Sequence, residues 1–210
     1  MTIPVIRPYP LPSTAELPGA RVAWRLDWSR ALLLVHDMQR HFVGFFQPGA
    51  EPVTSLVANI ARLRAHCTAR GVPVVYSAQP ADQTPGQRGL LTDFWGPGLR
   101  GAEAASVVDE LAPGPDDVLM TKWRYSAFHR TELADLLRAH GRDQLVVCGV
   151  YAHIGVQATA AEAFMRDVRT FVVADAVADF SRAEHDAALS YMAGRCASVT
   201  TVDGVLGDAR

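Results

Sequence analysis

The stretch ALLLVHDMQRHFVGFFQPGAEPVTSLVANIARLRAHCTARGVPVVYSA, residues 31–78, contains one complete strand–helix–strand pattern. Residues 31–35 form a continuous apolar run, which is typical of a strand that is buried on both faces. Residues 53–70 follow with the apolar spacing of an amphipathic helix, and Gly71 ends that helix. A second apolar run at residues 72–78 predicts the next strand, which we expect to lie parallel to the first.

The same alternation of apolar runs and helical segments continues toward the C-terminus. It predicts a single α/β domain built on a Rossmann-like parallel sheet of six strands, flanked by helices on both faces. The predicted strands are 31–35, 72–78, 118–121, 144–150, 171–174 and 197–202, and the predicted helices are 53–70, 107–111, 131–140, 156–167 and 182–193.

Two segments stand outside this alternation. Residues 1–24 are rich in proline, which excludes a regular helix, and we expect an extended arm laid over a hydrolase domain formed by residues 25–210. Residues 80–101 form a loop rich in Gly, Pro and Gln that is longer than a simple connection. Loops of this length are usually functional, so this one is a candidate part of a site.

Composition and charge narrow the function classes. The chain has 210 residues and a net charge of −2, so no basic excess points to nucleic acid or to an anionic membrane surface. We expect neither a secretory signal nor a transmembrane segment, because no apolar stretch has the required length. The three cysteines, Cys67, Cys148 and Cys196, lack Cys-x-x-Cys spacing, which favours reduced thiols in a cytoplasmic protein.

A site is expected beyond the carboxyl ends of the strands, where ligands bind in open parallel sheets. Asp37 and Lys122 follow two different predicted strands and offer a carboxylate and an ammonium group. From their position alone, this pair is either catalytic or a structural salt bridge at the sheet edge. The other residues that follow predicted strands are Gln79, Tyr151 and Gly155, together with Asp175 and Asp179, which we expect to be structural.

Several familiar motifs are missing from the sequence. There is no Gly-x-Gly-x-x-Gly after the first strand and no Walker-type loop, so no cofactor is expected. No His-Glu-x-x-His or similar spacing indicates a metal, and we expect none. No Gly-x-Ser-x-Gly elbow supports a serine nucleophile.

Six segments of the chain resemble the isochorismatase family, and the resemblance runs from the proline-rich arm to the last strand. Within the family it extends to the enzymes of catechol siderophore synthesis and to those of phenazine synthesis that act on 2-amino-2-deoxyisochorismate. The matching segments are LLVHDMQ (33–39), YSAQP (76–80), DFWGPG (93–98), TKWRYSAF (121–128), CGVYAHIG (148–155) and ADAVADFS (174–181).

The resemblance implies hydrolysis without a covalent intermediate. The wider superfamily includes cysteine amidohydrolases such as nicotinamidases, which use an Asp, a Lys and a nucleophilic Cys. Asp37 and Lys122 match the first two, whereas Gly155 stands where the Cys would be. Amide hydrolysis needs a strong nucleophile, but a vinyl ether needs only a well-placed acid that protonates its terminal methylene carbon. Gly155 would also leave room for the cyclohexadiene ring of the substrate.

Asp37 is the expected general acid, for which it must be protonated when substrate is bound. Burial raises the pKa of a carboxyl group and a nearby Lys122 lowers it, so the sequence leaves the balance open. Substrate carboxylates that neutralise Lys122 would shift the balance toward the protonated form. Because general acid catalysis contributes about 10²–10⁴-fold, loss of this carboxyl group should remove at least that much turnover.

The remaining site residues are implied by the resemblance. It places Gln79, Arg88, Trp95 and Tyr151 around the ligand, with a cis peptide bond just before Tyr151. Arg88 joins Lys122 as a partner for the substrate carboxylates. Phe42 and Trp95 would supply apolar walls that exclude water, and Cys148 is expected to be an inert buried thiol.

Two other functions stay open beside the vinyl ether hydrolase. One is a thiol amidohydrolase of the nicotinamidase type that uses Cys148, and the other is a non-catalytic interaction module. Within the first function, the chorismate-derived substrate is isochorismate or 2-amino-2-deoxyisochorismate. The resemblance also implies a homodimer. Because the chain stops shortly after Leu206, no fused aryl carrier domain is expected, and a separate carrier protein would serve instead.

Overall fold

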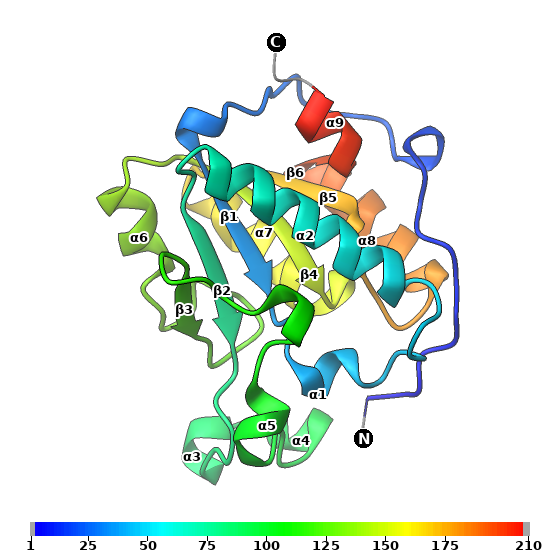
Figure 1. Cartoon of the computed structure of the whole chain (residues 1–210), viewed down its shortest axis with the longest axis vertical. Helices are drawn as coiled ribbons and strands as arrows, with labels where there is room; N and C mark the ends of the chain where they lie inside the picture. The colour runs from blue at the N-terminus through cyan, green and yellow to red at the C-terminus, as the bar shows by residue number, and fades with distance from the viewer. Residues whose placement is uncertain (1–2, 208–210) are drawn as a thin grey trace.

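Six strands form one parallel sheet in the order β3-β2-β1-β4-β5-β6 in the computed structural model, which describes residues 3–207 (Figure 1). Helices cover both faces, so the predicted α/β fold is confirmed. The strands are β1 Ala31–His36, β2 Val74–Ala78, β3 Val118–Thr121, β4 Gln144–Val150, β5 Arg169–Ala178 and β6 Ala197–Thr200.

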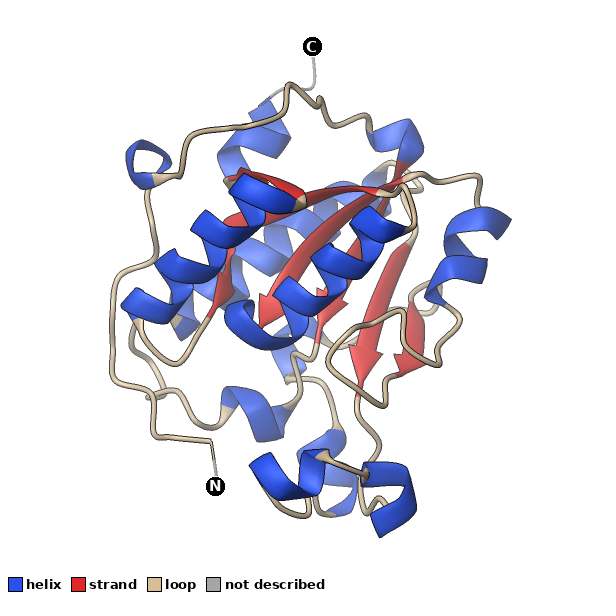
Figure 2. Cartoon of the chain, turned by 180° about the vertical axis from the view of Figure 1, so that it is seen from behind, coloured by secondary structure: helices blue, strands red, loops and turns tan. Residues whose placement is uncertain are grey.

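Each face of the sheet has its own apolar core. Leu33 and Val35 of β1 point into one core, and Leu32 and Leu34 point into the other, as the alternation of a strand requires. Full burial of one such side chain contributes about 1.5–3 kcal/mol. Figure 1 shows the first face and Figure 2 the opposite side of the molecule. The first core is covered by α2 (Val53–Ala69) and α9 (Val202–Gly207), and the second by α6 (Leu133–Ala139), α7 (Gln157–Met165) and α8 (Arg182–Arg195).

The described part of the arm, residues 3–24, runs extended over the domain and contains only the 3-10 turn η1, Thr14–Glu16. Ile6 is 1% exposed and joins the first core. The hydroxyl group of Tyr9 accepts a hydrogen bond of 2.7 Å from the backbone N–H of Asp179. The arm is therefore packed into the fold rather than frayed from it. Residues 1, 2 and 208–210 of the two predicted segments lie outside the described residues.

The predicted end of strand 171–174 was too early. The strand β5 continues to Ala178 because the β4–β5 register shifts between Val147 and Gly149, which lets the chain pass through Asp175 without leaving the sheet. Asp175 thus lies inside a strand, and its carboxylate accepts a hydrogen bond of 2.8 Å from the backbone N–H of Val202. Val202 is the first residue of helix α9. The last strand therefore ends at Thr200 and not at residue 202 as predicted.

The loop predicted at 80–101 contains short helices. They are too short to show a helical period in the sequence, and so is α1, which follows β1. The predicted helix 107–111 is only a 3-10 turn. Within residues 3–207, no helix has the length and apolar character needed to cross a membrane. The short elements are η2 Trp28–Arg30, α1 Arg40–Val43, α3 Pro85–Arg88, α4 Leu91–Trp95, α5 Gly101–Ala105, η3 Asp109–Leu111 and the π-helical turn η4 Ala152–Val156.

The strand order contains one topological switch point. From β1 the chain builds outward through β2 and β3 on one side, and it returns to β4 on the other side of β1. The connections that leave the carboxyl ends of β1 and β4 therefore diverge and open a crevice between them. This crevice is where the fold places a ligand.

Candidate active site

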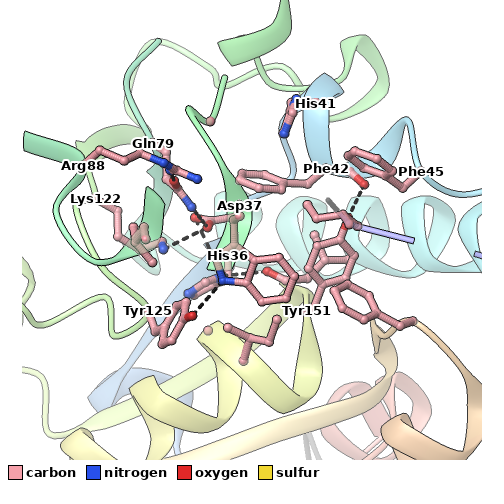
Figure 3. Close-up of a pocket in the computed structure, with 18 of the residues that line it drawn as sticks. His36, Asp37, His41, Phe42, Phe45, Gln79, Arg88, Lys122, Tyr125 and Tyr151 are labelled. Atoms are coloured by element: carbon pink, nitrogen blue, oxygen red, sulfur yellow. Dashed lines mark hydrogen bonds and ion pairs between the residues drawn. The ribbon is translucent and has the colours of Figure 1, made fainter. Parts of the chain in front are cut away.

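A cavity of about 230 Å³ lies at the carboxyl ends of the strands beside the switch point. Every residue predicted for the site borders this cavity, although the residues come from separate loops and short helices. Figure 3 labels Asp37, Phe42, Gln79, Arg88, Lys122 and Tyr151 among them. The predicted residues are Asp37, Phe42, Gln79, Arg88, Trp95, Lys122, Tyr151 and Gly155, and residues without a predicted role there include Ile3, His36, His41, Phe45, Tyr125 and Phe180.

Asp37 and Lys122 form a buried ion pair at the floor of the cavity. The Lys122 Nζ lies 2.9 Å from Asp37 Oδ2, and the two side chains are 1% and 6% exposed. The Lys122 ammonium also donates a hydrogen bond of 2.7 Å to the backbone carbonyl of Arg124. Asp37 adopts a backbone φ of 50° directly after β1, which turns the chain away from the sheet. Because both charged groups face a ligand-sized cavity, the pair is placed for chemistry on a bound molecule.

Two polar residues that were not predicted for the site hold this arrangement. The Ser77 hydroxyl donates a hydrogen bond of 2.6 Å to Asp37 Oδ1. Gln39 is fully buried and pairs with the backbone of Gln79, donating to its carbonyl and accepting from its N–H, at 2.8 Å in both cases. One signal could have revealed Ser77, because it is a polar residue near the carboxyl end of an otherwise apolar strand.

Electrostatics favour the ionised form of the Asp37 carboxyl group. Burial acts to raise its pKa, but the Lys122 ammonium, His36 and the Ser77 hydroxyl together outweigh burial. The net effect is a pKa below the ordinary value of 3.8. An ionised carboxylate cannot donate a proton, so acid chemistry at Asp37 requires that a bound ligand offset the positive charge of Lys122.

Gln79 connects Asp37 to Arg88 through polar contacts. The Gln79 Nε2 lies 3.4 Å from Asp37 Oδ2, and the Gln79 Oε1 accepts a hydrogen bond of 3.1 Å from Arg88 Nη1. Arg88 is 5% exposed, and burial lowers its pKa, with a further contribution from Arg124. The glycine at position 98 leaves room for the Arg88 guanidinium, because a Cβ on residue 98 would lie 2.7 Å from Arg88 Cζ. A buried guanidinium beside a cavity is suited to an anionic ligand.

Aromatic side chains form the other wall of the cavity. The Tyr151 hydroxyl donates a hydrogen bond of 2.6 Å to the backbone carbonyl of Phe42, and burial raises the pKa of Tyr151. The peptide bond between Val150 and Tyr151 is cis, as the family resemblance implied. Trp95 donates from Nε1 to the Tyr125 hydroxyl at 2.7 Å. The cavity thus has one charged wall and one apolar wall.

The predicted role of Gly155 was wrong in its physical detail. A Cβ on residue 155 would lie 2.2 Å from the Cε1 atom of His36, so the imidazole, and not free space for a substrate ring, fills that volume. The sequence could not show this, because the clearance at a glycine depends on which side chain from another strand faces it.

No thiol borders the cavity within the described part of the chain. Cys148 is completely buried in the core beneath α2, and burial raises the pKa of its thiol well above the ordinary range. These facts leave a Cys148 nucleophile without access to a ligand.

Among residues 3–207, no group of three or more His, Cys, Asp or Glu side chains is placed to hold a metal ion.

A known family and several known proteins match this chain over most of its length. Residues 31–204 match the model of the isochorismatase domain. An isochorismatase from Bacillus subtilis is 54% identical over 98% of this chain, which spans 66% of that protein. The phenazine biosynthesis protein PhzD1 from Pseudomonas aeruginosa is 55% identical over 97% of this chain and 98% of its own length. Enterobactin synthase component B from Escherichia coli is 48% identical over 98% of this chain and 73% of its own length.

Comparison with solved structures finds the same fold. A cysteine hydrolase from Pseudomonas syringae superposes with a TM-score of 0.80 at 26% identity, over 90% of this chain and 96% of that one. A protein described as a cysteine hydrolase therefore shares this fold. In this chain, no cysteine lines the cavity within residues 3–207.

Proposed function

The chain belongs to the isochorismatase family, and we propose that it hydrolyses the enolpyruvyl vinyl ether of isochorismate or 2-amino-2-deoxyisochorismate. The products are pyruvate and a trans-2,3-dihydro-3-hydroxy ring acid of the benzoate or anthranilate type. The observation that carries the proposal is the buried Asp37–Lys122 pair in a cavity that no thiol borders within the described residues. Relatives named for isochorismate, enterobactin and phenazine chemistry support a role in siderophore or phenazine synthesis.

Asp37 acts as the general acid in this proposal. Its carboxyl group gives a proton to the terminal methylene carbon of the vinyl ether, and the electron pair of the ether oxygen stabilises the resulting oxocarbenium ion. Water adds to the cationic carbon and returns one proton to the Asp37 carboxylate. The hemiketal then breaks its bond to the ring oxygen, which takes the hydroxyl proton, to give pyruvate and the ring alcohol. Because no acyl group is transferred, no protein nucleophile is needed.

Substrate binding changes the charge balance that sets the pKa of Asp37. Lys122 and Arg88 are the cations that border the cavity beside Asp37, and the substrate carries two carboxylates. A carboxylate held by Lys122 offsets the charge that lowers the pKa of Asp37, while burial, which raises that pKa, remains. We therefore infer that substrate and proton bind together.

The proposal extends to location and partners. We propose a cytoplasmic enzyme that forms a homodimer, as the family resemblance implies. The likeness to enterobactin synthase component B supports a separate aryl carrier protein as a further partner. The charged wall and the aromatic wall of the cavity support a small anionic ring compound as the substrate.

A coupled assay tests the reaction. The purified chain is incubated with isochorismate, 2-amino-2-deoxyisochorismate or chorismate, and pyruvate is measured through lactate dehydrogenase. We expect pyruvate from one or both of the first two compounds, and we expect no ammonia from nicotinamide. The absence of pyruvate from all three compounds would rule the proposal out, and ammonia from nicotinamide would instead favour an amidohydrolase.

A further inference from the structure

His36 is a buried side chain of the cavity to which the proposed reaction assigns no role. It ends β1 directly before Asp37, is 1% exposed, and borders the cavity. Its Nδ1 lies 2.8 Å from the backbone carbonyl of Val150, which can only accept, so Nδ1 is the donor. The other ring nitrogen, Nε2, has no hydrogen-bond partner within the described part of the chain.

Two glycines from the β4–η4 segment make room for this one residue. A Cβ on Gly155 would lie 2.2 Å from His36 Cε1 and 2.8 Å from Nε2. A Cβ on Gly149, which has a φ of 109°, would lie 2.1 Å from the His36 backbone oxygen. Real Cβ contacts are never this short, so a side chain at position 155 cannot coexist with the imidazole in its observed place. The imidazole is buried and hydrogen-bonded to the Val150 carbonyl, and both features oppose its displacement.

We propose that His36 and Gly155 form an interlocked pair that determines which chemistry the cavity supports. The imidazole occupies the volume that any side chain at position 155 would take, and so keeps a nucleophilic group away from Asp37 and Lys122. The distance of 3.7 Å between His36 Nδ1 and Asp37 Oδ1 shows how near that volume lies to the ion pair. The claim about which chemistry the cavity supports rests on the proposed function. The claim that His36 and a side chain at position 155 exclude each other does not depend on that function.

A double-mutant cycle on thermal stability tests the packing claim. His36→Asn removes Cε1 and Nε2, the two ring atoms nearest to position 155, and keeps an N–H for the Val150 carbonyl. We expect Gly155→Ala alone to lower Tm by about 2–12 °C through overpacking. In the His36→Asn background the same alanine should cost less than about a third of that loss. Gly194→Ala is the matched control, since a Cβ at Gly194 meets nothing within 4 Å.

Thiol labelling tests the specificity claim without any substrate. In Gly155→Cys combined with His36→Asn, a thiol should fit into the cavity, displace iodide from iodoacetamide and form a thioether at residue 155. We expect labelling at least about tenfold faster than in Gly155→Cys alone, measured by mass spectrometry of the peptide that contains residue 155. The native cysteines are all buried and serve as internal controls.

Each outcome decides the proposal. Equal cost of Gly155→Ala in both backgrounds, or equal labelling of the single and double cysteine variants, would overturn it. If Gly155→Ala does not fold, recovery of a folded protein in the double variant supports the interlock, and failure of that double variant while His36→Asn folds contradicts it. Because neither readout involves pyruvate, a failure of the proposed reaction would be seen separately in the coupled assay.

Discussion

Replacing Asp37 with asparagine should lower kcat for the isochorismate-type substrate by about 10²–10⁴-fold, with KM changed only slightly. Asparagine has the shape of aspartate, and its amide oxygen can still accept a hydrogen bond from Lys122 while its NH2 group faces the Ser77 hydroxyl, but the amide is not an acid. The loss should therefore fall on the step in which the proton is transferred. Initial rates of pyruvate release over a range of substrate concentrations measure the two constants separately.

The matched control is Asp203→Asn. The Asp203 side chain is 81% exposed and pairs with Arg62 on the surface, so this change should leave kcat unaltered. Thermal unfolding of both variants checks that the fold is kept. If the Asp37 variant retains most of its turnover, Asp37 is not the acid.

The pH dependence should separate free enzyme from the substrate complex. In the free enzyme the pKa of Asp37 is lowered below 3.8, so the protonated fraction falls tenfold for each pH unit above it. Because kcat/KM reports ionisations of the free enzyme, it should fall about hundredfold between pH 5 and pH 7. The value of kcat reports the complex, in which a substrate carboxylate offsets Lys122, so its decline should begin at a higher pH.

A substitution of Lys122 tests whether its charge causes this pH dependence of kcat/KM. Lys122→Met removes the charge that lowers the pKa of Asp37, so the descending limb of kcat/KM should move to higher pH, whatever the overall rate. A wild-type profile that rises with pH, or that is flat between pH 5 and pH 7, would show that Asp37 does not react as an acid. Steady-state assays in overlapping buffers at constant ionic strength give both profiles.

The sheet and the ion pair could be predicted because they follow from local patterns. Continuous apolar runs define buried parallel strands, and a polar residue directly after such a run must lie at the edge where ligands bind. Asp37 and Lys122 were found in this way. The short helices α1 and α9 could not be predicted, because four to six residues do not display a helical period.

Other parts of the site depend on contacts between distant segments. Arg88 and Trp95 were placed only by family resemblance, since no local pattern tells that residues 85–95 fold over the strand ends. Ser77 lies inside the apolar strand β2, where a polar residue is usually a satisfied core residue, and His36 ends β1 one residue beyond the predicted strand. The error at Gly155 has the same origin, because the imidazole that fills its clearance comes from a strand more than a hundred residues earlier in the chain.

Hydrolysis in deuterium oxide asks directly whether a proton reaches the methylene carbon. The wild-type enzyme is given its substrate in this solvent, and the pyruvate is trapped at once as lactate by lactate dehydrogenase. Transfer from the exchangeable carboxyl group of Asp37 predicts one deuterium atom in the methyl group of each product molecule, with slower turnover than in ordinary water. A methyl group that carries only hydrogen would contradict protonation at that carbon, and with it the role of Asp37.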